Sequence, residues 1–155
     1  MVEMYKNILV CENIRSAYNV GTIIRTADGL GRDVCLSGYS PHPETELKVR
    51  KSSLGAEHAI WLLQYRNTSE TIQYLQDNSY ILVALEITQE SISLRDLNFE
   101  KNTQSPIALI VGNEKTWILS ETLSACDHVV HIPMVWKKTS LNVAEAASIG
   151  MWNMS

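Results

Sequence analysis

The chain has 155 residues, of which 45% are apolar, and a formal net charge of −4. The apolar fraction excludes a disordered chain, and no stretch approaches the roughly 18 uninterrupted apolar residues that span a membrane. Residues 1–6 lack the basic and apolar pattern of a secretory signal. Three cysteines lie far apart with no C-x-x-C pair, which is typical of reduced thiols. We therefore expect one cytoplasmic domain over residues 1–155.

Strand and helix patterns alternate along the chain. Short apolar runs that are typical of buried strands occupy residues 7–11, 34–36, 59–63, 80–87, 107–111 and 129–132. Helical spacing is found at residues 20–30, in part of 48–58, and at 69–77, 118–126 and 140–152. The candidate N-caps of these helices are Asn19, Thr68 or Ser69, and Ser140. This alternation predicts an α/β fold, with a mostly parallel sheet and helices on both faces.

Ligands of such sheets bind beyond the carboxyl ends of the strands, so the polar turns there are the first candidates for a site. One of these turns reads N-I-R-S-A-Y-N-V-G-T-I-I-R-T-A-D over residues 13–28. Arg25 lies in it on an otherwise apolar helix, and its guanidinium needs an anionic partner because it cannot lose its proton. Either it forms a surface ion pair with Asp28, three residues on, or it serves a functional site.

Two further segments follow predicted strands. Gly112-Asn113-Glu114 comes directly after the run at 107–111, where the glycine allows close backbone approach and the carboxylate can orient a ligand. A plain turn would give the same tripeptide. Residues 132–134 read I-P-M, and residues 140–143 read S-L-N-V at the start of the last helix. One interpretation is that Ser140 caps a helix of the core. A functional interpretation instead depends on which groups Ser140 and Asn142 face.

Taken together and in this order, these segments resemble the three signature motifs of the SPOUT superfamily. The branch they resemble is the TrmH-like (SpoU) group of RNA 2′-O-ribose methyltransferases. The matching residues are N-x-G-x-x-x-R-T-A-D from Asn19, G-N-E from Gly112, and I-P-M followed by S-L-N-V. The resemblance extends over residues 13–147. Its specificity comes from the joint match, since each motif alone is modest.

The resemblance implies a fold that the residue pattern alone does not give. It implies a deep C-terminal trefoil knot, which is a rare exception to unknotted topology. It implies S-adenosylmethionine as the methyl donor, bound in that knot, and a homodimer whose two subunits both contribute to each site. The donor contacts that it implies are backbone atoms of Gly112, Ile132 and Leu141. The catalytic residues that it implies are Asn19, Arg25, Glu114, Ser140 and Asn142.

The reaction that the resemblance implies is methylation of a ribose 2′-hydroxyl, which requires tRNA or rRNA as substrate and excludes DNA. Arg25 would lower the pKa of that hydroxyl and bind a phosphate, because a guanidinium almost never acts as a free base. The negative net charge disfavours binding through many phosphates. RNA contacts are therefore expected from a few cations, with Arg15, Lys137 and Lys138 as candidates, and no appended RNA-binding domain is expected. The spacing of the histidines predicts no metal site.

Four positions depart from the family pattern: Lys115, Trp117, Trp136 and Ala144. Two of these changes introduce tryptophan. Relatives usually have glycine where this chain has Trp117 and Trp136. The two indoles could fill the donor pocket, stack on an adenine or an RNA base, or point outward. The alternative function is therefore a catalytically inactive knotted RNA-binding or scaffold protein with an altered donor pocket. A third possibility is an unrelated α/β nucleotide-binding domain.

Overall fold

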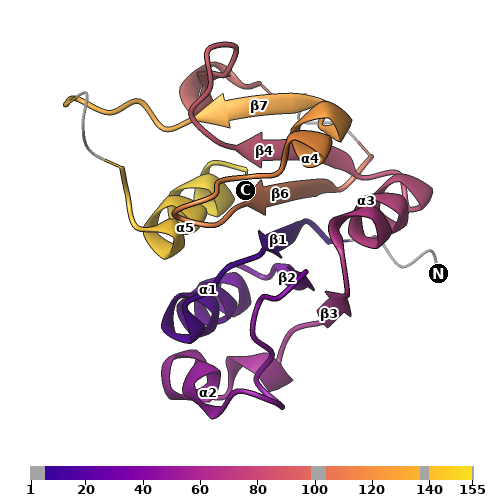
Figure 1. Ribbon diagram of the computed structural model, residues 1–155, viewed down its shortest axis with the longest axis vertical. Helices are drawn as coiled ribbons and strands as arrows, with labels where there is room; N and C mark the ends of the chain where they lie inside the picture. Colours follow the sequence, from indigo (N-terminus) through magenta and orange to yellow (C-terminus); the bar gives the residue numbers. More distant parts are fainter. Residues whose placement is uncertain (1–5, 99–103, 137–139, 155) are drawn as a thin grey trace.

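The computed structural model describes residues 6–98, 104–136 and 140–154 (Figure 1). Over these residues, strands form a seven-stranded sheet in the order β3-β2-β1-β6-β4-β7-β5, and every pair is parallel. The strands are β1 (Ile8–Glu12), β2 (Asp33–Ser37), β3 (Leu62–Tyr65), β4 (Ile81–Leu85), β5 (Ile92–Ser93), β6 (Ile107–Val111) and β7 (His128–His131). The predicted parallel sheet is confirmed.

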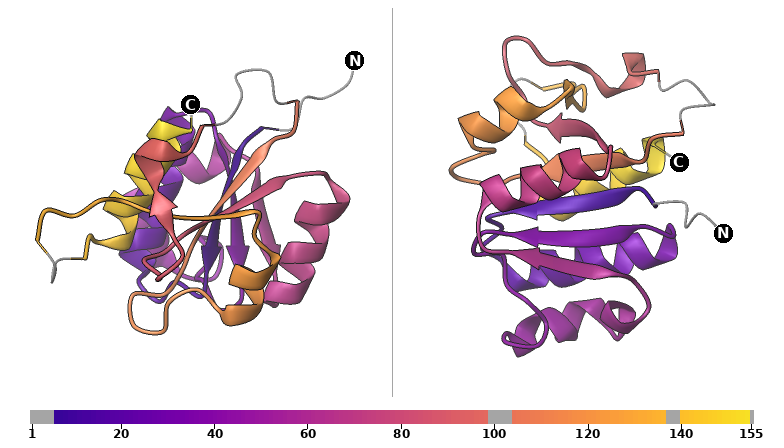
Figure 2. Two further views of the ribbon diagram at one scale, coloured as in Figure 1. Left: turned by 90° about the horizontal axis from the view of Figure 1, so that it is seen from above. Right: turned by 90° about the vertical axis from the view of Figure 1, so that its right-hand side faces the viewer.

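Helices cover both faces of this sheet (Figure 2). They are α1 (Ala17–Gly29), α2 (Leu47–Ser53), α3 (Thr68–Asp77), α4 (Ser120–Ala125) and α5 (Val143–Asn153). Two short 3-10 turns, η1 (Ala56–His58) and η2 (Leu94–Asp96), complete the described elements. The pair α1 and α5 packs on one face, with α2 against α1, while α3 and α4 pack on the other.

Two apolar cores result from the alternation of side chains along the buried strands. In β6, Leu109 and Val111 pack with α1 and α5, whereas Ala108 and Ile110 pack with α3 and the segment before α4. All five residues of β1, β2 and β6 are buried. A central strand must be apolar on both faces because helices cover both, and this explains why continuous apolar runs predicted these strands.

The predicted helix starts were wrong in three places. Helix α1 begins at Ala17 with Ser16 as its N-cap, and the Ser16 Oγ accepts from the Asn19 backbone N–H at 3.2 Å. Helix α3 is capped by Asn67, not by Thr68 or Ser69. Helix α5 is capped by Asn142, not by Ser140. In each case another polar residue nearby had equal capping ability, so composition alone could not select the cap.

Strand boundaries also differ from the prediction. The run at 59–63 was placed too early, since β3 spans Leu62–Tyr65, and the short edge strand β5 was not predicted. Two residues are too few to show any period in a sequence. Within the described residues, no helix is long and apolar enough to cross a membrane. The trefoil knot stays a prediction, and residues 137–139 lie outside the described residues.

Candidate active site

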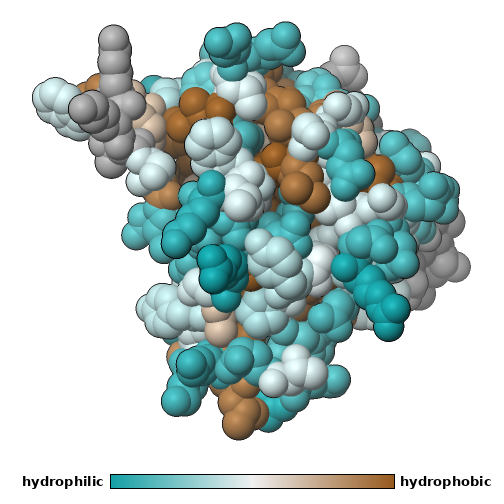
Figure 3. Space-filling model, viewed as in Figure 1, coloured by the Kyte–Doolittle hydropathy of each residue, from teal (hydrophilic) through white to brown (hydrophobic). Residues whose placement is uncertain are grey.

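A pocket of about 450 Å³ opens at the carboxyl edge of the sheet. Its walls are the segments that follow β4, β6 and β7, together with the start of α5. The lining residues are Leu85, Glu86, Ile87, Val111, Gly112, Asn113, Glu114, Trp117, His131, Ile132, Met134, Ser140, Leu141, Val143 and Ala146. In the view of Figure 1 the sheet carries apolar surface over β4 and β7, while the surface over α1 and α2 is mainly hydrophilic (Figure 3). The pocket lining therefore combines apolar side chains with a smaller number of polar ones.

Three predicted catalytic residues meet in one hydrogen-bond network beside this pocket. The Asn19 Nδ2 donates to the Glu114 Oε1 at 2.8 Å, and the Asn142 Nδ2 donates to the Asn19 Oδ1 at 3.2 Å. Asn19 is 7% exposed and lies in the first turn of α1, where Ser16 leaves its side chain free for this role. The network joins three segments that are 95 and 123 residues apart in sequence.

Asn113 connects the same loops through its buried side chain, which is 2% exposed. Its Nδ2 donates to the backbone oxygen of Asn13 at 2.9 Å and to the Tyr39 hydroxyl at 3.0 Å. Its Oδ1 accepts from the backbone N–H groups of Lys115 and Thr116. Every hydrogen-bonding capacity of this amide is therefore engaged, which fixes the loop after β6 against the loops after β1 and β2.

Two carboxylates hold the next part of that loop by its backbone. Glu12, at the end of β1 and 1% exposed, accepts the Leu119 N–H at 2.9 Å. Glu86, after β4, accepts the Ile118 N–H at 3.3 Å. Glu12 also accepts hydrogen bonds from the hydroxyls of Thr68 and Thr122, so it joins β1 to the starts of α3 and α4. Charged acceptors make the stronger hydrogen bonds, and these set the position of the pocket wall.

Gly112 and Trp117 show why glycine suits this loop. A Cβ on Gly112 would lie 2.7 Å from the Ile118 backbone nitrogen, so the loop closes on itself here and any side chain would force it open. Trp117 has φ 61°, in the left-handed region that glycine adopts freely. The backbone conformation at position 117 is therefore one that glycine would adopt without strain. Trp117 lines the open pocket without filling it, while Trp136 is not among the lining residues.

The remaining predicted site residues are distributed differently. Gly112, Ile132, Ser140 and Leu141 line the pocket. Arg25 is exposed on α1, and within the described part of the chain it forms no ion pair with Asp28 and does not line the pocket. Arg15 is exposed in the loop before α1. Lys137 and Lys138 lie outside the described residues.

Two polar pocket residues were not predicted. Glu86 was assigned to the interior of an apolar strand, because the run 80–87 shows no break before it. His131 was set aside as one of a pair that could not share a metal, yet it lines the pocket and its Nδ1 lies 2.9 Å from the Ser91 Oγ. A polar residue at the carboxyl end of a parallel strand is itself a signal of a binding site, and this rule identifies both Glu86 and His131.

The cysteines take no part in this site. Burial raises the pKa of Cys35 to about 12 and that of Cys126 to about 12, and burial with the nearby Cys35 also raises the pKa of Cys11. All three are free thiols and stay protonated at neutral pH. Among the described residues, no group of three or more His, Cys, Asp or Glu side chains is placed to hold a metal ion.

Comparison with known families agrees with this geometry. The model of the SpoU rRNA Methylase family matches residues 6–152, almost the whole chain. The chain belongs to this family. The matched range includes all the segments that line the pocket.

Similar proteins are known in sequence and in structure. A Staphylococcus saprophyticus protein whose name places it in the TrmH family of tRNA/rRNA methyltransferases is 29% identical over 147 residues, 95% of this chain and 57% of that protein. The AdoMet-bound rRNA methyltransferase of Sinorhizobium meliloti has a TM-score of 0.87 at 26% identity, covering 96% of this chain and 55% of that one. An RNA 2′-O ribose methyltransferase has a TM-score of 0.79 at 26% identity, covering 99% and 58%.

This SpoU family member therefore spans a little over half the length of the curated relatives that it matches. The matched half of each relative corresponds to the region that contains the sheet and the pocket described above.

Proposed function

We propose that this SpoU family chain transfers a methyl group from S-adenosylmethionine to a ribose 2′-hydroxyl of tRNA or rRNA. The observation that carries the proposal is the Asn19–Glu114–Asn142 network at the mouth of a pocket of about 450 Å³. Family membership and the likeness to an RNA 2′-O ribose methyltransferase support it.

The pocket suits the proposed donor in size and chemistry. Its volume lies within the range of small-molecule sites, about 300–1,000 Å³. Apolar side chains such as Leu85, Val111 and Ile132 suit a flat adenine ring. Polar groups of Glu86, His131 and Ser140 suit the ribose and amino-acid parts. When bound, S-adenosylmethionine supplies a methyl group on a sulfonium, which is already a strong electrophile.

The chain's own residues then orient the acceptor. The Asn19 amide is held by Glu114, which lines the pocket, and by Asn142, so its position beside the pocket is set before any ligand binds. Arg25 is assigned to the acceptor ribose and its phosphate: its positive charge lowers the pKa of a nearby 2′-hydroxyl and its guanidinium binds phosphate oxygens. The 2′-hydroxyl is absent from DNA, which accounts for the choice of RNA.

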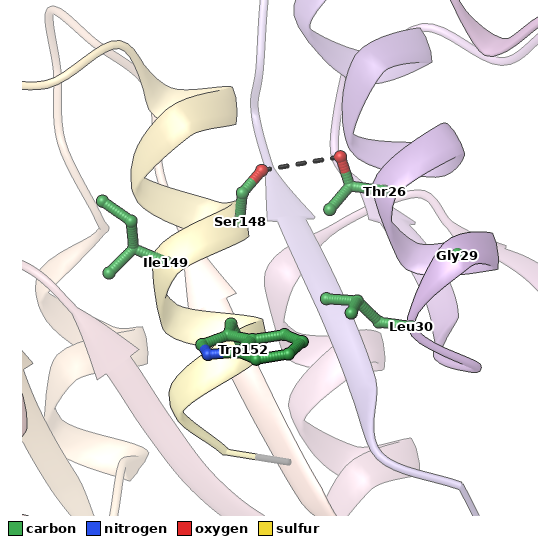
Figure 4. Close-up of a pocket in the computed structure, with 6 residues that line it drawn as sticks. All are labelled: Thr26, Gly29, Leu30, Ser148, Ile149 and Trp152. Carbon is green, nitrogen blue, oxygen red and sulfur yellow. Dashed lines mark hydrogen bonds between the residues drawn. The ribbon is translucent and has the colours of Figure 1, made fainter.

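We further propose a homodimer in which Arg25 serves the pocket of the partner subunit. Arg25 does not line the pocket of its own chain, and the residue after it, Thr26, lines a groove between α1 and α5. Figure 4 shows this groove, with Trp152 and Leu30 facing each other across it and Ser148 hydrogen-bonded to Thr26. Trp152 is 71% exposed and Ile149 is 43% exposed, so the groove presents apolar surface to solvent.

The methyl-transfer proposal is tested by separating donor binding from chemistry. Titration calorimetry with S-adenosylmethionine should show binding by the unaltered chain and nearly equal binding by Arg25→Ala. Methylation of bulk tRNA or rRNA by Arg25→Ala should fall by about 100-fold or more, the range expected when a group assisting proton removal is lost. Arg95→Ala, another exposed arginine, should behave as the unaltered chain.

Two outcomes would contradict this assignment. If millimolar donor gives no heat of binding with the unaltered chain, the chain is a knotted RNA-binding or scaffold protein instead of an enzyme. If Arg25→Ala loses donor affinity, Arg25 belongs to the donor site, not to the acceptor.

A further inference from the structure

Trp117 lines the candidate active site, and two other exposed aromatic side chains belong to segments that hydrogen-bond to the loop that carries it. Tyr18 is 69% exposed, Tyr39 is 57% exposed and Trp117 is 64% exposed. They come from the first turn of α1, the loop after β2 and the loop after β6. All three segments lie at the carboxyl edge of the sheet, where the pocket opens. We refer to these three residues as the aromatic rim.

The hydrogen bonds of the site tie the aromatic rim to one network. The Tyr39 hydroxyl accepts from the Asn113 Nδ2 at 3.0 Å, and the Trp117 backbone N–H donates to the Asn113 oxygen at 2.9 Å. Tyr18 directly precedes Asn19, whose side chain donates to Glu114, the residue after Asn113. The Tyr18 backbone oxygen also accepts from the Ser52 hydroxyl at 2.9 Å. The three rings are therefore carried by backbone that the site itself holds in place.

At this position the Trp117 side chain contributes little to the stability of the fold. Its φ of 61° is disfavoured for any residue that has a Cβ, and the exposed indole receives little burial in return. Glycine would adopt the same conformation without strain. A strained and exposed aromatic residue at the mouth of a site is a reason to look for a ligand that it contacts.

The charge of the chain narrows the choice of ligand. A net charge of −4 gives little affinity through release of counterions from phosphates. Aromatic rings bind unpaired bases by stacking, and this works with any base because every base has a π face. Arg15 is exposed in the loop that leads to Tyr18, where it can contact the backbone of a strand stacked on the rim.

We propose that the aromatic rim stacks on bases of an unpaired RNA segment and so selects single-stranded or loop nucleotides as substrate. This inference rests on the proposed function, since it requires RNA at the pocket. A base stacked on Trp117 or Tyr39 would lie beside the pocket mouth, and paired bases cannot expose their faces in this way. The substrate class is therefore an unpaired nucleotide, not a helical segment.

The test compares Trp117→Gly with Trp61→Ala. Trp61 is 62% exposed but precedes β3, at the opposite edge of the sheet, so it is a matched control. The probe is a fluorescein-labelled ten-nucleotide single-stranded RNA, measured by anisotropy against the same strand annealed in a duplex. The unaltered chain and Trp61→Ala should prefer the single strand. Trp117→Gly should bind it about tenfold more weakly, within the range measured for loss of one stacked base.

The midpoint of thermal unfolding separates loss of stacking from loss of fold. Trp117→Gly should unfold at the same or a higher temperature, because glycine relieves the left-handed strain. If the affinity of Trp117→Gly for the single strand is within twofold of that of the unaltered chain, the inference is overturned. It is also overturned if the unaltered chain prefers the duplex. A Trp117→Gly chain that loses donor affinity but keeps RNA affinity would also overturn it, by assigning the indole to the donor.

Donor binding and methyl transfer by the unaltered chain are measured alongside and test the proposed function on their own. Suppose that the unaltered chain methylates RNA and that Trp117→Gly binds single-stranded RNA as tightly as the unaltered chain does. The proposed function then stands, and the proposed role of the aromatic rim is refuted. Suppose instead that the unaltered chain binds no donor, while Trp117→Gly binds single-stranded RNA more weakly than the unaltered chain does. The proposed role of the aromatic rim then stands, and the proposed methyl transfer is refuted.

Discussion

Glu12 is a buried carboxylate whose role is structural. It accepts the Leu119 N–H and two threonine hydroxyls, from Thr68 and Thr122, which together connect β1 to α3, α4 and the pocket wall. Glu12 directly follows the apolar run at residues 7–11, in a position where the sequence alone suggests a solvated glutamate. Its burial depends on donors that are 56, 107 and 110 residues away, and no local pattern reveals them.

Replacing Glu12 with Gln should destabilise the fold. The amide has one acceptor oxygen where the carboxylate has two, so a buried threonine hydroxyl or the Leu119 N–H loses its acceptor. We expect a loss of about 1–3 kcal/mol in the free energy of unfolding. Urea denaturation followed by circular dichroism measures it, with exposed Glu90→Gln as the control. Equal stability of the two variants would show that the three hydrogen bonds contribute nothing net.

The candidate site could be predicted in part from single residues. Asn19, Glu114 and Asn142 were identified by their motifs, and the structure brings them together. Tyr39 was not identified, because its contribution depends on the position of the Asn113 amide, which lies 74 residues away. Motifs identify residues whose type is specific, whereas residues that only support a site have no distinctive local pattern.

At the scale of elements, helix α1 shows how close packing fixes a residue type. Gly21 faces α2, and a Cβ there would lie 2.0 Å from the Ser52 Oγ and 2.3 Å from the Val49 backbone oxygen. Gly29 ends the same helix, and a Cβ there would have nothing within 4 Å. The two glycines of this helix therefore differ in whether a side chain fits: there is no room for one at Gly21, and there is open space at Gly29.

Gly21→Ala should destabilise the chain, while Gly29→Ala should not. At Gly21 the new methyl meets backbone of α2, so the helices must separate at a cost of about 1–3 kcal/mol or more. At Gly29, which lines the α1–α5 groove, alanine meets no atom of its own chain and has the better helix propensity, so the stability of the single chain should stay equal or rise by up to about 1 kcal/mol. Thermal unfolding of both variants measures the difference. A lower unfolding midpoint for Gly29→Ala than for Gly21→Ala would contradict this packing.

Element types were easier to predict than element boundaries. Buried strands were evident because both faces of β1 and β6 are covered, so nearly every residue is apolar. Helix starts were harder, because Ser16 and Asn19 are both good caps. In the structure Ser16 is the cap, and the Asn19 amide donates instead to Glu114 in the loop after β6. Tertiary contacts therefore decide what local propensity leaves open.

At the scale of the whole molecule, the parallel sheet and its helical layers were predictable, but the strand order was not. The alternation of strands and helices is compatible with several orders, and the observed order places β6 between β1 and β4. The resemblance to the SPOUT superfamily supplied the expectation of a knot, which stays a prediction. A single domain over residues 1–155 and a cytoplasmic location also stay predictions.

The proposed homodimer predicts the effect of a charge in the α1–α5 groove. Trp152→Glu would place a carboxylate in an apolar interface, where desolvation of the charge is costly. We expect sedimentation velocity to give a mass twice that of one chain for the unaltered protein and the mass of one chain for Trp152→Glu. Trp61 directly precedes β3 and lies away from this groove, so Trp61→Glu should remain dimeric. A Trp152→Glu chain that stays dimeric would place the interface elsewhere.

The pairing of β1 with β6 has a consequence for synthesis on the ribosome. Ile8 pairs with Ala108, so one edge of an entirely buried strand lacks its neighbour until about 100 more residues have been made. At roughly 5–20 residues per second, that interval lasts on the order of 5–20 s. During it, the nascent chain displays an apolar strand edge that can join other chains.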